Sequence, residues 1–217
     1  MKVNEMITSL EEKVFLQLEE EILLGKIPIG SSLGEVAISA RLGVSRTPVR
    51  SALHRLAEEG LVQILANKGA VVTGVSREDL IDIYRIRVRL EGLASAIAAE
   101  RMSKEEIESL RDSVDLAEFY IKKQDTERLK ELDTDFHVAI YEASGNKLLS
   151  KTLSELHKKI RTYRKMSLDV PGRLENSVYE HRGILDAIEA GNAAEADRLT
   201  SLHVEHALDN IMCALDN

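Results

Sequence analysis

The sequence predicts a mainly α-helical protein in two parts, with three helices and a β-hairpin in residues 1–75 and an antiparallel all-α bundle of about six helices in residues 76–217. Apolar residues recur at helical spacing through most of the chain. Two short apolar, β-branched runs between residues 61 and 72 are the exception, and they predict a hairpin. Long amphipathic segments follow residue 76, so the domain boundary is placed between Thr73 and Ser76.

The first two helices are indicated by capping residues and by periodicity. Ser9 and Glu12 fit a capping box that starts a helix, and Gly25 ends that helix. Its apolar face repeats every four residues, at Leu10, Val14, Leu18 and Ile22. A turn follows, and a short second helix is predicted over residues 35–42.

The third helix carries arginines on one face and apolar side chains on the other. It follows a tight turn at Gly43 and ends before Gly60. Arg46 and Arg50 are four residues apart and therefore share a face. A helix with a cationic first turn, placed after a helix and a glycine turn, is typical of helix-turn-helix proteins, which insert it into the DNA major groove. The hairpin completes a winged helix-turn-helix, with its turn at residues 67–69.

Capping residues and glycine breaks divide the second part into six predicted helices. Ser103 with Glu106 forms another capping box, and Asn192 caps the last helix. The predicted helices cover approximately residues 77–102, 104–124, 126–144, 148–165, 174–189 and 193–217. Six helices in about 140 residues indicate an antiparallel bundle.

Charge and composition fit an intracellular DNA-binding protein. The net charge is −8, yet residues 41–68 carry a local net charge of +3, so the positive field is confined to the predicted DNA-reading helix and wing. Cys213 is the only cysteine, which excludes an intramolecular disulfide framework and indicates a reducing compartment. The sequence shows neither the apolar run of roughly 20 residues that a membrane span needs nor a signal-peptide core. A cytoplasmic protein without membrane contact is therefore expected.

Four residues of the second part form a constellation that is able to bind a metal. Asp133 and His137 are four residues apart and project from one helix face. His181 and His203 lie on the apolar sides of the fifth and last helices, where a buried imidazole needs a partner. From spacing alone, two interpretations stay open: hydrogen-bonded core histidines, or a site for Zn²⁺ or another first-row divalent cation with open coordination positions.

Residues 9–73 resemble the DNA-binding domain of the GntR family of bacterial transcription regulators. The matching residues are Ile22, Gly25, Ile27, Pro28, Gly30, Leu33, the block from Leu42 to Arg50, Ala52, Leu53, Leu56, the run from Glu59 to Val62, Asn67, Gly69 and Val72. The resemblance implies DNA contacts from the third helix and the wing tip. The candidate DNA-binding residues are Arg41, Ser45, Arg46, Thr47, Arg50, Lys68 and Gly69.

The chain departs from the GntR pattern at two positions. Ser51 stands where many members have glutamate, and Val36 stands where one branch has a DNA-contacting arginine. The second departure removes the side chain that contacts DNA from the start of the second helix in that branch. We therefore expect base contacts from the third helix and not from residue 36.

Residues 76–217 resemble the FCD ligand-binding domain of the FadR subfamily within that family, of the shorter, six-helix, VanR-like kind. The matching residues are Ile83, Tyr84, Ile86, Arg87, Leu90, Glu91, the block from Asp133 to His137, the run from Ala143 to Asn146, His181, Ile184, Ala187, Ile188 and His203. The resemblance implies a metal held by Asp133, His137, His181 and His203, with zinc favoured and nickel or manganese open. His157 and His206 have no counterpart in that pattern, and His157, among lysines, is expected at the surface.

The family implies a metabolite-responsive transcriptional regulator: a repressor released when a small organic acid binds at the metal. Arg87 is the candidate effector-binding residue, because arginine suits bidentate carboxylate recognition. A salt bridge from Arg87 to Glu91 on the same helix is the alternative.

The expected partner is double-stranded DNA with a short inverted repeat, bound by a homodimer, because one winged helix reads only a half-site. The first two bundle helices are the expected dimer contact. We expect no enzyme activity. Two other classes stay in view: a DNA-binding regulator with a purely structural metal and, more remotely, a metal-dependent hydrolase.

Overall fold

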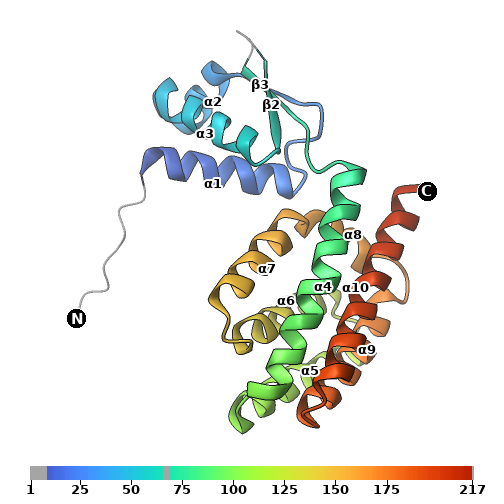
Figure 1. Cartoon of the computed structure of the whole chain (residues 1–217). Helices are drawn as coiled ribbons and strands as arrows, with labels where there is room; N and C mark the ends of the chain where they lie inside the picture. The colour runs from blue at the N-terminus through green and yellow to red at the C-terminus, as the bar shows by residue number, and fades with distance from the viewer. Residues whose placement is uncertain (1–8, 66–68, 217) are drawn as a thin grey trace. The chain divides into compact units, whose positions relative to one another are not determined.

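The computed structural model describes residues 9–65 and 69–216, apart from the side chain of residue 162. The chain divides into two compact units, and the division falls between Arg77 and Glu78. Figure 1 shows a first unit of helices and a small sheet, and a second unit made of helices alone. Each unit is described by itself below.

The first unit contains three helices and a three-stranded antiparallel sheet. In chain order the elements are α1 (Leu10–Leu23), β1 (Ser32–Leu33), α2 (Glu35–Leu42), α3 (Arg46–Glu58), β2 (Val62–Leu65) and β3 (Gly69–Val72). The strand order is β1-β3-β2, so β3 pairs with both neighbours. The predicted helices and hairpin are present, whereas β1 was not predicted, because two residues carry no readable periodicity.

The core of the first unit forms where α1 packs on α3. Val14, Leu18, Val49, Leu53 and Leu56 are buried there, as the four-residue spacing predicts. At the start of α1 the Glu12 backbone N–H donates to Ser9 Oγ over 3.1 Å, so the predicted cap is present. The Glu12 side chain binds Arg55 of α3 instead of closing the capping box. That ion pair joins the two helices.

Glycine is required at two turns of the first unit. Gly43, between α2 and α3, has a φ of 65°, the left-handed conformation that ends α2. Gly69 begins β3 with a φ of 86°, and a Cβ on it would lie 2.3 Å from the Leu33 carbonyl oxygen. The wing therefore approaches β1 at a place where a side chain does not fit.

The second unit contains seven helices. They are α4 (Arg77–Arg101, whose first residue belongs to the first unit), α5 (Lys104–Lys123), α6 (Thr126–Ala143), α7 (Lys147–Lys159), α8 (Arg161–Leu168), α9 (Arg173–Glu189) and α10 (Ala193–Asp216). The single helix expected over residues 148–165 is wrong, because the chain breaks at Ile160 into α7 and α8. Ile160 is fully buried, and neither proline nor glycine marks the break.

Capping and core packing set the positions of α5, α6, α9 and α10. The capping box of Ser103 and Glu106 is present at the start of α5. The Asn192 side chain accepts the Glu195 backbone N–H at the start of α10, as expected. Apolar residues of α6 and α9 pack in one buried cluster: Phe136, Ile140, Ile184, Leu185 and Ile188.

Among the described residues, the helices are too short or too polar to cross a membrane.

Candidate functional site

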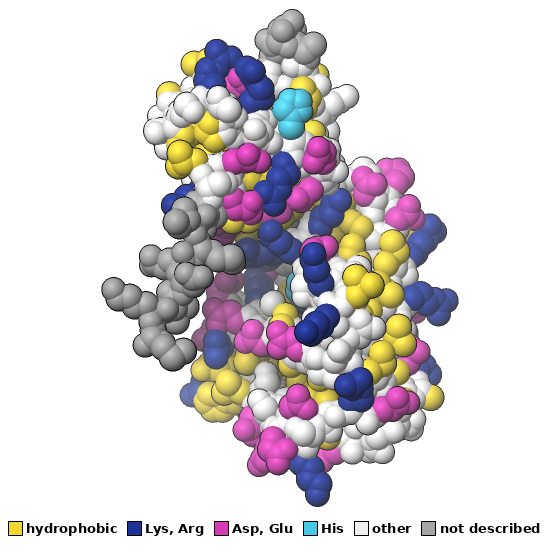
Figure 2. All heavy atoms as spheres, turned by 60° about the vertical axis from the view of Figure 1, so that its left-hand side comes forward, with side chains coloured by type: hydrophobic (Ala, Val, Ile, Leu, Met, Phe, Trp, Pro, Cys, Tyr) yellow, Lys and Arg dark blue, Asp and Glu magenta, His cyan; other side chains and the backbone are white. Residues whose placement is uncertain are grey.

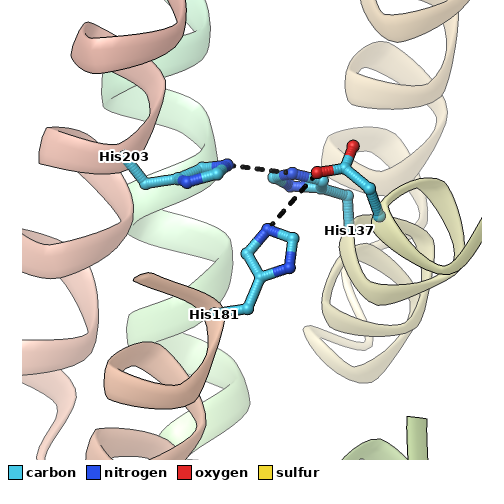
Figure 3. A group of neighbouring side chains, drawn as sticks. His137, His181 and His203 are labelled. Carbon is cyan, nitrogen blue, oxygen red and sulfur yellow. Dashed lines mark hydrogen bonds and ion pairs between the residues drawn. The ribbon is translucent and has the colours of Figure 1, made fainter. Parts of the chain in front are cut away.

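The second unit brings the four predicted metal ligands together. Asp133 and His137 project from α6, His181 from α9 and His203 from α10, and all four side chains are buried. One nitrogen or oxygen atom from each lies within 4.8 Å of the others. Figure 3 shows the three imidazole rings converging from separate helices. Phe136 stacks on His181 with ring centroids 4.0 Å apart and so fixes that ring.

Two glutamates behind the histidines orient two of the rings. His203 Nδ1 bonds Glu180 Oε2 over 2.6 Å, and His137 Nδ1 faces Glu91 Oε2 at 3.1 Å. The Glu180 carboxylate accepts the Nδ1 proton of His203, which leaves a lone pair on His203 Nε2. The two Nε2 atoms lie only 3.2 Å apart. Both nitrogens therefore face the same point, together with the oxygen of Asp133.

His181 completes this donor set. Its Nε2 is buried without a hydrogen-bond partner in the described part of the chain, and it lies 3.7 Å from Asp133 Oδ1. A buried polar atom without a partner is unfavourable. Three imidazole nitrogens and one carboxylate, with carboxylates behind two of the rings, match the way proteins hold first-row divalent metals.

Electrostatics keep Asp133, His181 and His203 in the protonation states that a metal needs. Burial raises the pKa of Asp133, but Arg164 and the three histidines outweigh it, so the pKa lies well below its usual range. Burial lowers the pKa of His181 far below normal. For His203 burial again dominates and lowers the pKa to about 4, although the hydrogen bond to Glu180 opposes it. At neutral pH these groups are a carboxylate and neutral imidazoles.

Three arginines surround the cluster, and only Arg87 among them was expected from the sequence. Arg164 Nη2 donates to Asp133 Oδ2 over 2.5 Å, and Arg173 Nη1 donates to Glu180 Oε2 over 2.7 Å. Ser177 Oγ donates to the other oxygen of Asp133 over 2.9 Å. Arg164 reaches the site from α8, 31 residues from Asp133 in the sequence, whereas Arg173 and Glu180 lie seven residues apart on the same helix, α9.

Arg87 forms the salt bridge that was predicted as the alternative, and it also lines a cavity beside the four candidate ligands. Its Nε donates to Glu91 Oε1 over 2.6 Å within α4, so the salt bridge exists and is buried. The same side chain lines a small cavity together with Asp133, His137, Arg164, Arg173 and His203. Its Nη1 is buried without a hydrogen-bond partner among the described residues. The cavity measures about 20 Å³, which is room for about one water molecule.

The remaining two bundle histidines lie outside the four-residue cluster. The expectation that His157 is a surface residue is wrong, because it is buried and its Nδ1 lies 3.4 Å from Tyr141 Oη. It follows Leu149 and Leu153 at four-residue steps, so it shares their inner face while the lysines point outward. His206 Nδ1 bonds Glu180 Oε1 over 2.7 Å and is half-exposed.

The first unit places its candidate DNA-binding residues around the start of α3. Ser45 is the N-cap of α3, and Arg46 and Arg50 project from its first turns with exposed side chains. Arg41 pairs with Glu21 over 2.7 Å, and Gly69 begins β3. Figure 2 shows Lys and Arg side chains gathered at the upper end of this unit around an acidic group. Thr47 lies in α3, whereas Lys68 lies outside the described residues.

Comparison with known families identifies the family to which the protein belongs. The family model for bacterial regulatory proteins of the gntR family matches residues 10–72, and the model for the FCD domain matches residues 82–206. The chain belongs to the GntR family. As a GntR-family protein with an FCD domain, it is a DNA-binding transcriptional regulator and not an enzyme, which sets aside the metal-dependent hydrolase.

Relatives of this GntR-family chain are transcriptional regulators as well. A probable D-xylose utilization operon transcriptional repressor from Paenarthrobacter nicotinovorans is 33% identical over 185 residues, covering 85% of this chain and 80% of that protein. The repressor RspR of Escherichia coli is 25% identical over 200 residues, covering 92% and 88%. The solved structure of E. coli McbR/YncC has a TM-score of 0.72 at 23% identity, covering 97% and 99%, and shows the shared fold.

Proposed function

We propose that this GntR-family regulator holds one divalent cation with Asp133, His137, His181 and His203 and responds to a small carboxylate metabolite bound beside it. The observation that carries the proposal is the facing pair of Nε2 atoms, 3.2 Å apart, next to the unpartnered Nε2 of His181. Four such donors around one point suit Zn²⁺, with Ni²⁺ or Mn²⁺ as alternatives set by availability. A cation held there supplies Lewis-acidic positions for oxygen ligands.

The charges around the cluster support an anionic effector. Arg87 pairs with Glu91, Arg164 with Asp133, and Arg173 with Glu180, so three buried cations face three carboxylates. A dication among the four ligands is then left without counter-charge in a buried site, which is unfavourable. An organic acid with two negative charges supplies that counter-charge, and the unpartnered Arg87 Nη1 offers it a donor. A hydroxy acid, a dicarboxylic acid or a sugar acid has this chemistry.

The volume of the cavity makes effector binding a conformational event. About 20 Å³ does not hold an organic acid, so side chains on α8 or α9 must move when one binds. Arg164 on α8 is the side chain best placed to move, because a cation at Asp133 competes for the same carboxylate. Such a movement gives the effector different affinities for two states, as allosteric release from DNA requires.

A metal assay combined with thermal shifts tests this proposal. We expect about one metal ion per chain by elemental analysis, and a higher Tm with particular organic acids that disappears after chelation. His181→Ala is expected to lose the metal and the acid response while retaining DNA binding. His157→Ala, which removes a buried imidazole outside the cluster, is the matched control and is expected to keep the metal. Metal-free wild-type protein, unchanged by chelation, would contradict the proposal.

A purely structural metal is the second candidate function, and the size of the cavity favours it. In that case Asp133 and the histidines bind the cation only to hold α6, α9 and α10 together. The same measurements separate the two functions. Stoichiometric metal with no Tm response to any acid indicates the structural role, whereas an acid response that depends on the metal indicates the sensor.

The DNA-binding part of the proposal assigns operator contacts to residues of α3 and the wing. The proposed contact residues are Arg41, Ser45, Arg46, Thr47, Arg50, Lys68 and Gly69. We infer that the protein represses transcription, as the names of the relatives from P. nicotinovorans and E. coli state for those proteins. Its place of action is then the cytoplasm, where bacterial DNA lies.

A homodimer is proposed because a winged helix reads one half of an inverted repeat. Exposed apolar side chains on the first two bundle helices support a contact there: Ile86 and Leu93 on α4, and Leu116 and Phe119 on α5. Light scattering on the full chain tests this inference. We expect about twice the chain mass of 24.2 kDa at micromolar concentration, and a monomer would contradict it.

A further inference from the structure

One carboxylate holds both candidate base-reading arginines of the first unit. Glu35, the first residue of α2, accepts from Arg50 Nε over 2.7 Å and from Arg50 Nη2 over 2.8 Å. Its Oε2 also accepts from Arg46 Nη2 over 2.9 Å and from Arg46 Nε over 3.3 Å. The Glu35 side chain is 18% exposed, whereas both arginine side chains are 59% exposed. The carboxylate therefore lies behind the two guanidinium groups.

The geometry leaves the outer edge of each guanidinium available. An arginine has five N–H donors, and Glu35 takes one from Nε and one from Nη2 in both residues. Within residues 9–65 and 69–216, neither Nη1 group has a partner. The end of the guanidinium, formed by Nη1 and the second Nη2 hydrogen, is an edge able to donate two bonds to guanine O6 and N7.

We propose that Glu35 is a positioning residue for DNA recognition, which fixes Arg46 and Arg50 with their outer edges directed at base edges. This inference rests on the proposed DNA contacts of those two arginines. A long side chain loses rotamer freedom when it binds, and a partner that fixes it beforehand lowers that loss. Glu35 is itself held by its place in the first turn of α2, where the helix dipole favours a negative charge.

The same carboxylate lowers affinity for DNA of arbitrary sequence. Non-specific binding depends on cations that neutralise phosphates, and Glu35 cancels one of the two arginine charges. Specific binding gains from arginines in fixed positions, so both effects raise the ratio of specific to non-specific affinity. A residue that merely stabilised the fold would leave this ratio unchanged.

The test compares two affinities for each variant of the full-length protein. The specific probe is a duplex that the wild-type protein selects from a random pool, and the non-specific probe is a scrambled duplex of equal composition and length. For Glu35→Gln we expect at least about fivefold weaker binding to the selected duplex, the lower range for one bidentate base contact. Binding to the scrambled duplex is expected to stay equal or to tighten.

Glu12→Gln is the matched control. It removes one negative charge and one arginine partner of the same helix α3, since Glu12 pairs with Arg55, but neither arginine of the reading pair is involved. This control is expected to keep the affinity ratio of the wild type. Glu35→Asp, whose carboxylate is too short to reach both arginines, is expected to lower the ratio as Glu35→Gln does. Thermal unfolding establishes that each variant is folded.

Two results for Glu35→Gln would overturn the inference, and both leave the ratio of specific to non-specific affinity unchanged. If neither affinity changes, Glu35 does not position the arginines. If both affinities rise by the same factor, Glu35 is an inhibitory contact instead. Arg50→Ala separates this failure from a failure of the proposed function. If Arg50→Ala lowers the ratio and Glu35→Gln does not, only the role of Glu35 is wrong; if neither lowers it, the assignment of base contacts to Arg50 is wrong too.

Discussion

The two units of this regulator use the same ion pair, glutamate with arginine, in opposite environments. In the first unit Glu35 bonds two arginines that remain more than half exposed. In the second unit Glu91 and Arg87 are 0% and 2% exposed, and Glu91 also faces His137. Breaking an exposed pair costs little stability, because water replaces the lost contact. A buried pair has no such replacement.

The difference matches what each unit has to do. The two arginines that are proposed to read DNA need an edge open to a base, and their pairs with Glu35 leave both side chains more than half exposed. The pairs around Asp133 and the histidines form the wall of a small cavity, so their charges are fixed in place. Burial raises the pKa of Glu91, yet Arg87 and His137 outweigh it and hold that pKa well below its usual range. The buried carboxylate therefore stays ionised.

The largest effect on stability is expected from breaking the buried pair of Arg87 and Glu91. Glu91→Ala leaves the Arg87 cation buried without its carboxylate, which we expect to lower the free energy of unfolding by about 3–5 kcal/mol. Glu35→Ala, which breaks the exposed pair, is expected to leave the Tm of the protein unchanged. Urea denaturation followed by circular dichroism measures both variants. Equal losses in the two variants would remove the distinction between the units.

The next largest effect on stability is expected from removing the proposed metal. At a concentration one hundred times its Kd, a bound ligand stabilises the folded state by about 2.7 kcal/mol. Chelation is therefore expected to lower the Tm of the wild-type protein by several degrees. His181→Ala is expected to show no change on chelation, because it lacks one of the four ligands. A chelation shift that persists in His181→Ala would place the metal elsewhere.

Local sequence signals predicted most of the elements, β1 and the break between α7 and α8 excepted, and they predicted the four residues of the cluster. Capping at Ser9, Ser103 and Asn192 depends on residues three positions apart, and all three caps are present. Asp133 and His137 share a helix face at four-residue spacing, and His181 and His203 lie on apolar stripes of their own helices. Spacing alone left open whether these residues are hydrogen-bonded core side chains or metal ligands; the structure places all four in one buried cluster.

Contacts between distant segments were not readable in this way. Arg164 bonds Asp133 from 31 residues away, and Glu35 bonds Arg46 and Arg50 from 11 and 15 residues away. Arg87 with Glu91, at four-residue spacing, was predicted as an alternative and is present. The break at Ile160 was also missed, because the residue is an apolar, fully buried side chain and no proline or glycine marks the position.

A smaller effect, confined to binding, is expected for Arg50→Ala. Loss of one bidentate base contact is expected to weaken binding to the selected duplex by roughly 10- to 100-fold. Stability is expected to remain unchanged, because the Arg50 side chain is exposed and its pair with Glu35 is solvated. Fluorescence anisotropy with labelled duplex measures the affinity, and thermal unfolding measures stability. A large loss of Tm would show that the exposed pair is structural after all.

The smallest effect concerns the pH dependence of the exposed pair. Hydrogen bonds from Arg50 and Arg46 lower the pKa of Glu35 from 4.5 to about 2. A carboxyl group whose pKa is depressed on folding contributes stability above the unfolded value near 4.5, and that contribution is lost as the pH falls towards 2. Because the pair is exposed, we expect only a slight difference in Tm between wild type and Glu35→Gln above pH 5.

Carboxyl NMR on the full chain measures the titration of Glu35 directly. We expect Glu35 to remain ionised down to pH 3 and its pKa to return towards 4.5 when Arg46 and Arg50 are both replaced by alanine. A Glu35 that titrates near 4.5 in the wild type would show that solvent competes successfully for the two arginines. The exposed pair would then be too weak to position the two arginines. The weakness of exposed pairs relative to buried ones would then apply to DNA recognition as well as to stability.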